Sequence, residues 1–224
     1  MRLWVSESQG NSGSRGLPRP WVAAAQRVVH VRKPPADFGG RAYLSGMIQY
    51  ALFETAIGVG GIAWSPAGLV GCHLPEREAE TARRGLLRRF PGAAEAEIPA
   101  SLAATVEGVR ALLRGEKADL SGAPLDLGRT PPFHARVYEI ARTIPPGETL
   151  TYGEIAERLG DRLLARDVGQ ALGANPWAIV VPCHRVTAAG GKPGGFSARG
   201  GVATKLKLLA IEGAKAAAQG DLFA

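Results

Sequence analysis

Proline and glycine divide the chain from residue 65 onward into short segments, and this spacing limits the folds that it can adopt. Ser65-Pro66-Ala67-Gly68 separates two apolar runs, and Pro91-Gly92 and Pro145-Pro146-Gly147 each end a helical pattern. Proline cannot continue a helix, and glycine favours turns and helix ends. We therefore expect short strands and short helices in an α+β fold.

The first patterned part of the chain predicts strands that are followed by helices. Apolar runs predict strands at 48–57, 59–64 and 69–74, with the Pro-Gly turn between the last two. Residues 76–89 fit a helix, and a second helix fits 100–114, with Leu102, Val106, Val109 and Leu113 on one face. We assign residues 47–120 to one α/β domain.

The second part predicts helices and forms a second domain over 121–213. Residues 132–143 fit a helix, and Thr151-Tyr152-Gly153-Glu154 has the form of a capping box that starts a helix at Tyr152 and carries it to Leu159. A further short helix fits Ala165 to Leu172. Two short helices with a tight connection are a helix-turn-helix candidate. The polar, turn-rich stretch 115–131 is interpreted as a linker between the domains.

The ends and the composition exclude several classes of protein. Residues 1–46 lack periodicity and are expected to be a disordered extension, and 214–224 a C-terminal tail. Two cysteines and four scattered histidines predict no metal site and no disulfide framework. No apolar run approaches the roughly 20 residues that cross a bilayer, so we expect a cytoplasmic protein without a membrane partner. The net charge of +7 favours a polyanionic partner.

Residues 175–186, Asn-Pro-Trp-Ala-Ile-Val-Val-Pro-Cys-His-Arg-Val, carry the chemistry. The β-branched run 179–181 predicts a buried strand that ends at Pro182 and delivers Cys183 beside His184. A nucleophilic cysteine must become a thiolate, and a neighbouring base helps it to do so. A bare Cys-His pair, however, fits a buried structural cysteine as well as a nucleophile.

The complete Pro-Cys-His-Arg-Val string resembles the active-site signature of the O6-alkylguanine-DNA alkyltransferases, also called methylated-DNA–protein-cysteine methyltransferases. Asn175-Pro176 precedes the cysteine, and Gly194-Gly195-Phe196-Ser197 and Gly200-Gly201 follow it at the family's spacing. Thr204 to Gly213 resembles the family's closing helix. The resemblance is strong over 128–213 and diffuse over 47–127. It implies a ribonuclease-H-like N-terminal domain and a winged-helix-like C-terminal domain with a helix-turn-helix.

The resemblance also implies catalytic roles for matching residues. Cys183 corresponds to the alkyl acceptor, and His184 to the base that draws the thiol proton through a water. Glu212 matches the carboxylate that orients the histidine. Tyr152 matches the tyrosine that donates to the guanine ring as it leaves. Asn175 matches a residue that ties the end of the recognition helix to the active-site turn.

The same resemblance implies the residues that meet DNA. Arg166, 17 positions before the cysteine, corresponds to the arginine that fills the stack when the damaged nucleotide is flipped out. Small residues on the same helix, Gly169, Ala171 and Gly173, imply a slender surface for the minor groove, where readout is degenerate. Asp167 is unexpected beside phosphates.

The substrate pocket is expected around Pro182, Val186, Phe196 and Ser197. Phe196 stands where the family often has tyrosine, so a ring remains for stacking but a hydroxyl is lost. Arg199 interrupts the glycine-rich loop. Its side chain has two expected positions, against a DNA phosphate or in the pocket.

The function that the resemblance implies is DNA repair by one irreversible transfer of an alkyl group from O6-alkylguanine, or from O4-alkylthymine, to Cys183. It implies a monomer acting once on double-stranded DNA, with no cofactor. Three alternatives remain: a lesion-binding protein that does not transfer, a thiol hydrolase with a Cys-His-Glu triad, and a helix-turn-helix regulator. Ester turnover would identify the hydrolase, and base-specific major-groove contacts the regulator.

Overall fold

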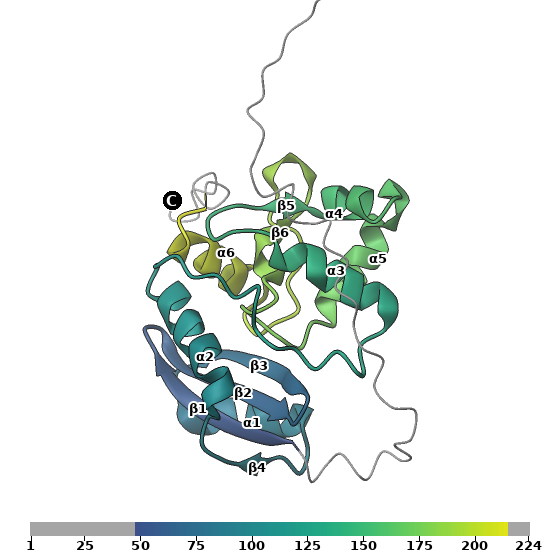
Figure 1. The fold of residues 1–224 in the computed structure, drawn as a ribbon. Helices are drawn as coiled ribbons and strands as arrows, with labels where there is room; N and C mark the ends of the chain where they lie inside the picture. Colours follow the sequence, from purple (N-terminus) through teal and green to yellow (C-terminus); the bar gives the residue numbers. More distant parts are fainter. Residues whose placement is uncertain (1–47, 215–224) are drawn as a thin grey trace, which may run out of the picture. The chain divides into compact units, whose positions relative to one another are not determined.

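The computed structural model describes residues 48–214, and within them the chain is a mixed α+β protein (Figure 1). The expected disordered extension over 1–46 and the tail beyond residue 214 lie outside the described residues. Across residues 48–214 we find no helix with the length and apolar character that crossing a membrane requires.

A four-stranded sheet forms the first part of the described chain. Its strands are β1 (Gln49–Thr55), β2 (Gly58–Ser65), β3 (Gly68–Glu76) and β4 (Ala94–Glu95), in the order β3-β2-β1-β4. The first three strands are antiparallel, and β4 runs parallel to β1. The three predicted strands are thus confirmed. The two-residue β4 was not predicted, because so short an element has no periodicity.

Helices α1 (Ala79–Arg89) and α2 (Ala100–Leu113) pack on opposite faces of this sheet. Leu86 of α1 packs with Tyr50 and the neighbouring Leu52. On the other face, Arg110 of α2 lies 5.7 Å from the centre of the Phe53 ring. Successive side chains of a strand point to opposite faces of its sheet. The side chains of residues 50 and 53 therefore lie on opposite faces of the sheet, one under each helix. The helix that the sequence predicts from residue 76 begins at Ala79, because β3 continues to Glu76.

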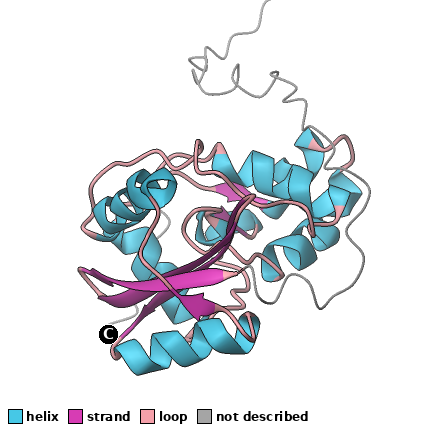
Figure 2. Cartoon of the chain, turned by 60° about the horizontal axis from the view of Figure 1, so that its bottom comes forward, coloured by secondary structure: helices cyan, strands magenta, loops and turns pink. Residues whose placement is uncertain are grey.

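Short helices dominate the second part of the chain (Figure 2). The Thr151–Glu154 capping box is present at the start of α4 (Tyr152–Arg158), as predicted. A two-stranded parallel sheet joins β5 to β6. The elements are α3 (Pro132–Arg142), β5 (Leu150–Thr151), α4 (Tyr152–Arg158), η3 (Arg162–Leu164), α5 (Ala165–Gly173), η4 (Cys183–Arg185), β6 (Val186–Thr187), η5 (Ala189–Gly191) and α6 (Gly201–Ile211).

Backbone hydrogen bonds fix later segments of the chain to the edge strand β3. The Leu69 amide donates to the Pro124 carbonyl at 2.8 Å, which holds part of the stretch that the sequence suggested as a linker. The Cys72 amide donates to the Pro176 carbonyl at 2.9 Å, and the Trp177 indole donates to the Leu69 carbonyl at 2.7 Å. Strand β3 therefore supports the turn that leads to Cys183.

The predicted strand at 179–181 is wrong, because these residues form a turn. Ile179 has a φ of 72°, in the left-handed region that β-branched residues rarely adopt. The Val181 amide donates back to the Trp177 carbonyl at 2.8 Å, which closes the turn. All three side chains are buried, so the apolar run reflects burial and not strand pairing.

We expect Leu86→Ala to lower the free energy of unfolding by roughly 2–5 kcal/mol, because it opens a cavity between α1 and the sheet. Leu86 is buried, and its side chain fills the space over Gly61, where an added Cβ would lie 2.5 Å from Leu86 Cδ1. Urea denaturation monitored by circular dichroism measures the loss. The exposed Arg88→Ala on the same helix is the control and should change stability by about 0.5 kcal/mol or less. Equal effects of the two substitutions would contradict the packing described.

Candidate active site

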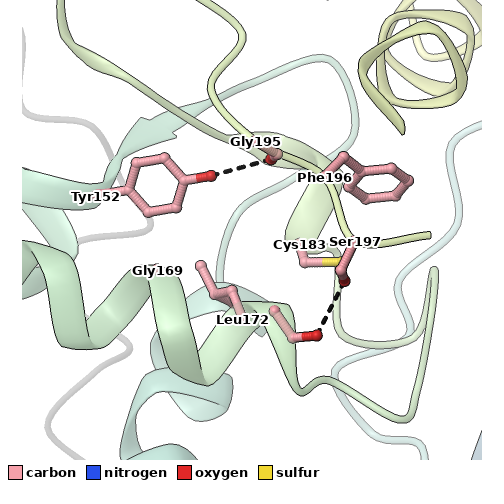
Figure 3. Close-up of a pocket in the computed structure, with 8 residues that line it drawn as sticks. Tyr152, Gly169, Leu172, Cys183, Gly195, Phe196 and Ser197 are labelled. Carbon is pink, nitrogen blue, oxygen red and sulfur yellow. Dashed lines mark hydrogen bonds between the residues drawn. The ribbon is translucent and has the colours of Figure 1, made fainter.

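A cavity of about 460 Å³ opens beside Cys183 (Figure 3). Its walls come from the first turn of α4, one side of α5, the start of η4 and the loop before α6. The lining residues are Tyr152, Gly169, Leu172, Gly173, Cys183, Gly195, Phe196 and Ser197. The cavity therefore combines a thiol, a phenol and an aromatic ring, and its α5 side carries two glycines.

Cys183 begins the single turn η4 and is a free thiol, partly exposed at the cavity. Burial raises the pKa of the thiol, whereas a hydrogen bond with Asn175 and the positive charge of Lys205 lower it. The thiol is thus protonated at neutral pH and needs a base before it can attack an electrophile. Polar groups that favour the thiolate are already beside it.

His184 and Arg185 share one carboxylate, that of Glu212 at the end of α6. His184 Nε2 lies 3.0 Å from Glu212 Oε1, and the Arg185 guanidinium donates to both carboxylate oxygens at 2.7 and 2.9 Å. Arg185 also donates to the Ile144 carbonyl at 2.6 Å. Burial raises the pKa of Glu212, but its hydrogen bonds with His184 and Arg185 outweigh burial and bring the pKa to about 2.

This arrangement decides where His184 carries its proton. The ionised carboxylate of Glu212 can only accept, so Nε2 must be the donor. Burial lowers the pKa of His184, which keeps the ring neutral and leaves Nδ1 as an acceptor. Nδ1 is buried and has no hydrogen-bond partner among the described residues. It can therefore take up a proton, directly or through a water.

Two charged residues of the site were missing from the sequence prediction. The sequence analysis included Arg185 in the motif but gave it no role of its own. A buried carboxylate needs a cationic partner, and Arg185 was the cation in the motif that could have been assigned to Glu212. Lys205 is fully buried and donates to the carbonyls of Val186 and Gly195. Its Nζ lies 5.7 Å from the centre of the Tyr152 ring, and burial lowers its pKa to about 8. Lys205 lies four residues before Leu209 and seven before Glu212, and this helical spacing is the signal in the sequence that could have placed it on the inner face of α6.

Two hydrogen bonds attach the loop before α6 to the cavity walls (Figure 3). The Tyr152 hydroxyl donates to the Gly195 carbonyl at 3.3 Å, and the Ser197 hydroxyl donates to the Gly173 carbonyl at 2.9 Å. Burial and then the charge of Cys183 raise the pKa of Tyr152, so its hydroxyl keeps its proton at neutral pH. The phenol is therefore a hydrogen-bond donor at the cavity.

The residues expected to meet DNA do not share one environment. Arg166 is exposed at the start of α5, and Gly169 and Gly173 line the cavity. Ala171 is fully buried beneath Tyr138, whose hydroxyl donates to its carbonyl at 2.8 Å. The expectation that Ala171 belongs to the exposed slender surface is therefore wrong, because it lies on the inner face of the helix.

The expected pocket residues also divide into two groups. Phe196 and Ser197 line the cavity, whereas Pro182 and Val186 are buried and do not. Leu172 and Gly195 take their place in the lining. Asn175 lies just after α5 and donates from Nδ2 to the Val181 carbonyl at 2.8 Å, so it ties the helix end to the turn before Cys183. Among residues 48–214, His, Cys, Asp and Glu side chains form no cluster able to hold a metal ion.

Comparison with known proteins gives consistent matches. The family model for the 6-O-methylguanine DNA methyltransferase DNA-binding domain matches residues 132–214. A methylated-DNA–protein-cysteine methyltransferase of Mycolicibacterium paratuberculosis is 39% identical over 177 residues, 79% of this chain and 99% of that protein. A DNA base-flipping protein of Thermus thermophilus is 43% identical over 56% of this chain and 82% of its own length.

Solved structures agree with these matches. The crystal structure of Mycobacterium tuberculosis O6-methylguanine methyltransferase is similar with a TM-score of 0.58 and 35% identity, over 75% of this chain and 93% of that one. A structure of Mycobacterium tuberculosis OGT in complex with DNA gives a TM-score of 0.59 and 34% identity, over 74% and 92% of the two chains.

We expect Glu212→Gln to lower the free energy of unfolding by roughly 3–5 kcal/mol at pH 7, because Arg185 would remain buried without its anionic partner. The pKa of Glu212 is held near 2, so its charge stabilises the fold above the ordinary pKa of 4.5 and the effect is lost as pH falls toward 2. Denaturation at several pH values should show that the difference in free energy of unfolding between parent and variant becomes smaller as pH falls from 4.5 toward 2. Glu157→Gln, which breaks only an exposed ion pair with Arg162, is the control. A difference independent of pH would contradict this role of the carboxylate.

Proposed function

The chain belongs to the methylated-DNA–protein-cysteine methyltransferase family, and from this premise we propose that Cys183 is the residue that receives the alkyl group. The protein repairs DNA by direct transfer of an alkyl group from O6-alkylguanine to one of its own cysteines. The observation that carries the assignment is the position of Cys183. Cys183 lines the cavity. The next residue in the chain, His184, is hydrogen-bonded to Glu212.

The reaction that these residues support is a single displacement. His184 Nδ1 takes the thiol proton through a water, and its Nε2 proton remains on the hydrogen bond to Glu212. The Cys183 sulfur then forms a bond to the alkyl carbon as the bond from that carbon to O6 breaks. Guanine leaves as a neutral carbonyl compound because the Tyr152 hydroxyl gives its ring one proton, and the proton that His184 took from the thiol replaces it through solvent, so atoms and charge balance. The thioether product is stable, and each molecule acts once.

Lys205 and Tyr152 support the two ends of this displacement. The buried charge of Lys205 favours the thiolate at the start, as its effect on the pKa of Cys183 indicates. Tyr152 keeps its hydroxyl proton and faces the cavity, where it can turn from the Gly195 carbonyl to a ring nitrogen of guanine. A hydrogen bond to the developing negative charge on the leaving group strengthens in the transition state.

DNA is the partner of the protein, and we propose that α4 and α5 bind it as a helix-turn-helix. The target atom lies inside the duplex, so the damaged nucleotide must be flipped into the cavity. Arg166 is exposed at the start of α5, and a planar guanidinium suits the vacated stack. Gly169 and Gly173 let the helix approach closely where it borders the cavity.

The finer description of fold and assembly is also a proposal. The β3-β2-β1-β4 sheet with helices on both faces supports a ribonuclease-H-like domain over 47–120, followed by the alkyltransferase domain over 121–213. We also keep the expectation of a monomer that acts on alkylated double-stranded DNA. We keep the cytoplasm as the expected location.

Intact-protein mass spectrometry after mixing with duplex DNA that contains one O6-methylguanine tests the acceptor. We expect the parent to gain one methyl group in place of one proton, in equal molar amount with the lesion, and Cys183→Ala to gain nothing. Cys72→Ala is the matched control, because burial raises the pKa of that second thiol to about 12 and keeps it unreactive. Tight lesion binding without mass gain would instead favour the lesion-binding alternative.

Arg166→Ala should slow methyl transfer from duplex DNA roughly tenfold or more, because flipping costs a few kcal/mol and each 1.4 kcal/mol changes a rate tenfold. Transfer from the free base O6-benzylguanine should be unchanged, since no duplex has to be opened. Single-turnover kinetics with both substrates measure the two rates. Arg162→Ala, on the preceding turn, is the control. Equal slowing with duplex and free base would contradict a role in flipping.

A further inference from the structure

Arg199 occupies neither of the two positions that the sequence suggested. Its Nη1 lies 3.2 Å from Oε2 of Glu76, the last residue of β3. The Arg199 side chain is 76% exposed and that of Glu76 is 18% exposed. An acidic residue of the N-terminal sheet therefore holds a cation that belongs to the loop of the cavity wall.

Glu76 is a fixed partner for this contact. It pairs with Val59 in the sheet, and its carbonyl packs so closely on Gly58 that a Cβ there would lie 2.3 Å away. His73 Nε2 lies 3.8 Å from the second carboxylate oxygen, Oε1. The strand thus sets the position of the carboxylate, and the loop adapts to it.

The loop residues next to Arg199 form part of the cavity wall. Phe196 and Ser197 line the cavity, three and two residues before Arg199. The Arg199 carbonyl accepts from the Thr204 hydroxyl at 2.8 Å, which fixes its backbone to α6. The segment begins and ends at glycines with positive φ, Gly194 at 72° and Gly200 at 82°. Such positions let a segment turn with little steric cost.

We propose that Glu76 and Arg199 are specificity-determining residues, because their ion pair holds the outer wall of the cavity and limits the size of the alkyl group that reaches Cys183. This inference rests on the proposed function of the cavity. Without the pair, the segment from Gly194 to Gly200 keeps its other contacts but loses its attachment to the sheet. Phe196 can then move outward, and a bulky group gains more from the added space than a methyl group does.

The test compares two duplexes that differ only in the group on O6 of one guanine, methyl or benzyl. Rates of transfer are measured for the parent, for Glu76→Gln, for Arg199→Gln and for the double variant. The ratio of benzyl to methyl rate should rise roughly two- to fivefold in each single variant, the range that an exposed ion pair can produce. The ratio in the double variant should be no higher than in the single variants, because the two residues act through one contact.

Two more variants sharpen the result. The exchange of charges in Glu76→Arg with Arg199→Glu should return the ratio toward the parent value. Glu78→Gln removes an exposed acid two residues after Glu76 and should leave the ratio of benzyl to methyl rate unchanged. Thermal unfolding of each variant verifies that the fold is intact.

An unchanged ratio in both single variants would overturn the proposal. So would weaker duplex binding with a smaller salt dependence in Arg199→Gln alone, because that result would assign Arg199 to a DNA phosphate. Failure of the parent to transfer either group is a different outcome. It would overturn the proposed function and not the coupling between sheet and loop.

Discussion

The site depends on the hydrogen bonds that the buried carboxylate of Glu212 accepts. This carboxylate accepts from His184 and Arg185 at once, and Arg185 in turn reaches the Ile144 carbonyl after α3. The side chain of Glu212 is only 5% exposed, so the pair is desolvated and would be costly without these partners. One carboxylate therefore joins α6, η4 and the end of α3, and also fixes the tautomer of the histidine.

The turn that presents Cys183 is strained and is held from both sides. Ile179 adopts a left-handed φ of 72°, a conformation that costs of order 1–3 kcal/mol and persists only where the surroundings enforce it. The Asn175 amide holds the Val181 carbonyl, and strand β3 holds the Pro176 carbonyl. Arg89 of α1 also donates to the Asn175 carbonyl at 3.1 Å. The N-terminal sheet and its helix thus contribute to the geometry around the thiol without touching the cavity.

Burial and charge oppose each other around Cys183. Desolvation raises the pKa of the thiol and lowers that of His184, so both groups are uncharged at neutral pH, whereas Lys205, with a pKa lowered to about 8, still carries its charge there. A neutral histidine can accept a proton, and a resting thiol is protected from oxidation, because only the thiolate reacts readily. Such a balance suits a protein that can use its cysteine only once.

The sequence by itself determined the short elements, the α+β class and the motif around Cys183, because proline, glycine, the capping box and the Pro-Cys-His-Arg-Val string act locally. The family resemblance matched Glu212 to the carboxylate that orients the histidine, and the structure places its Oε1 atom 3.0 Å from His184 Nε2. The sequence could not determine the conformation of 179–181, because an apolar β-branched run serves a buried turn as well as a strand. Nor could it assign Ala171, Pro182 and Val186 to the interior or give Arg185, Lys205 and Arg199 their partners. Those contacts join residues as many as 123 positions apart, and only the folded chain brings such residues within hydrogen-bond distance.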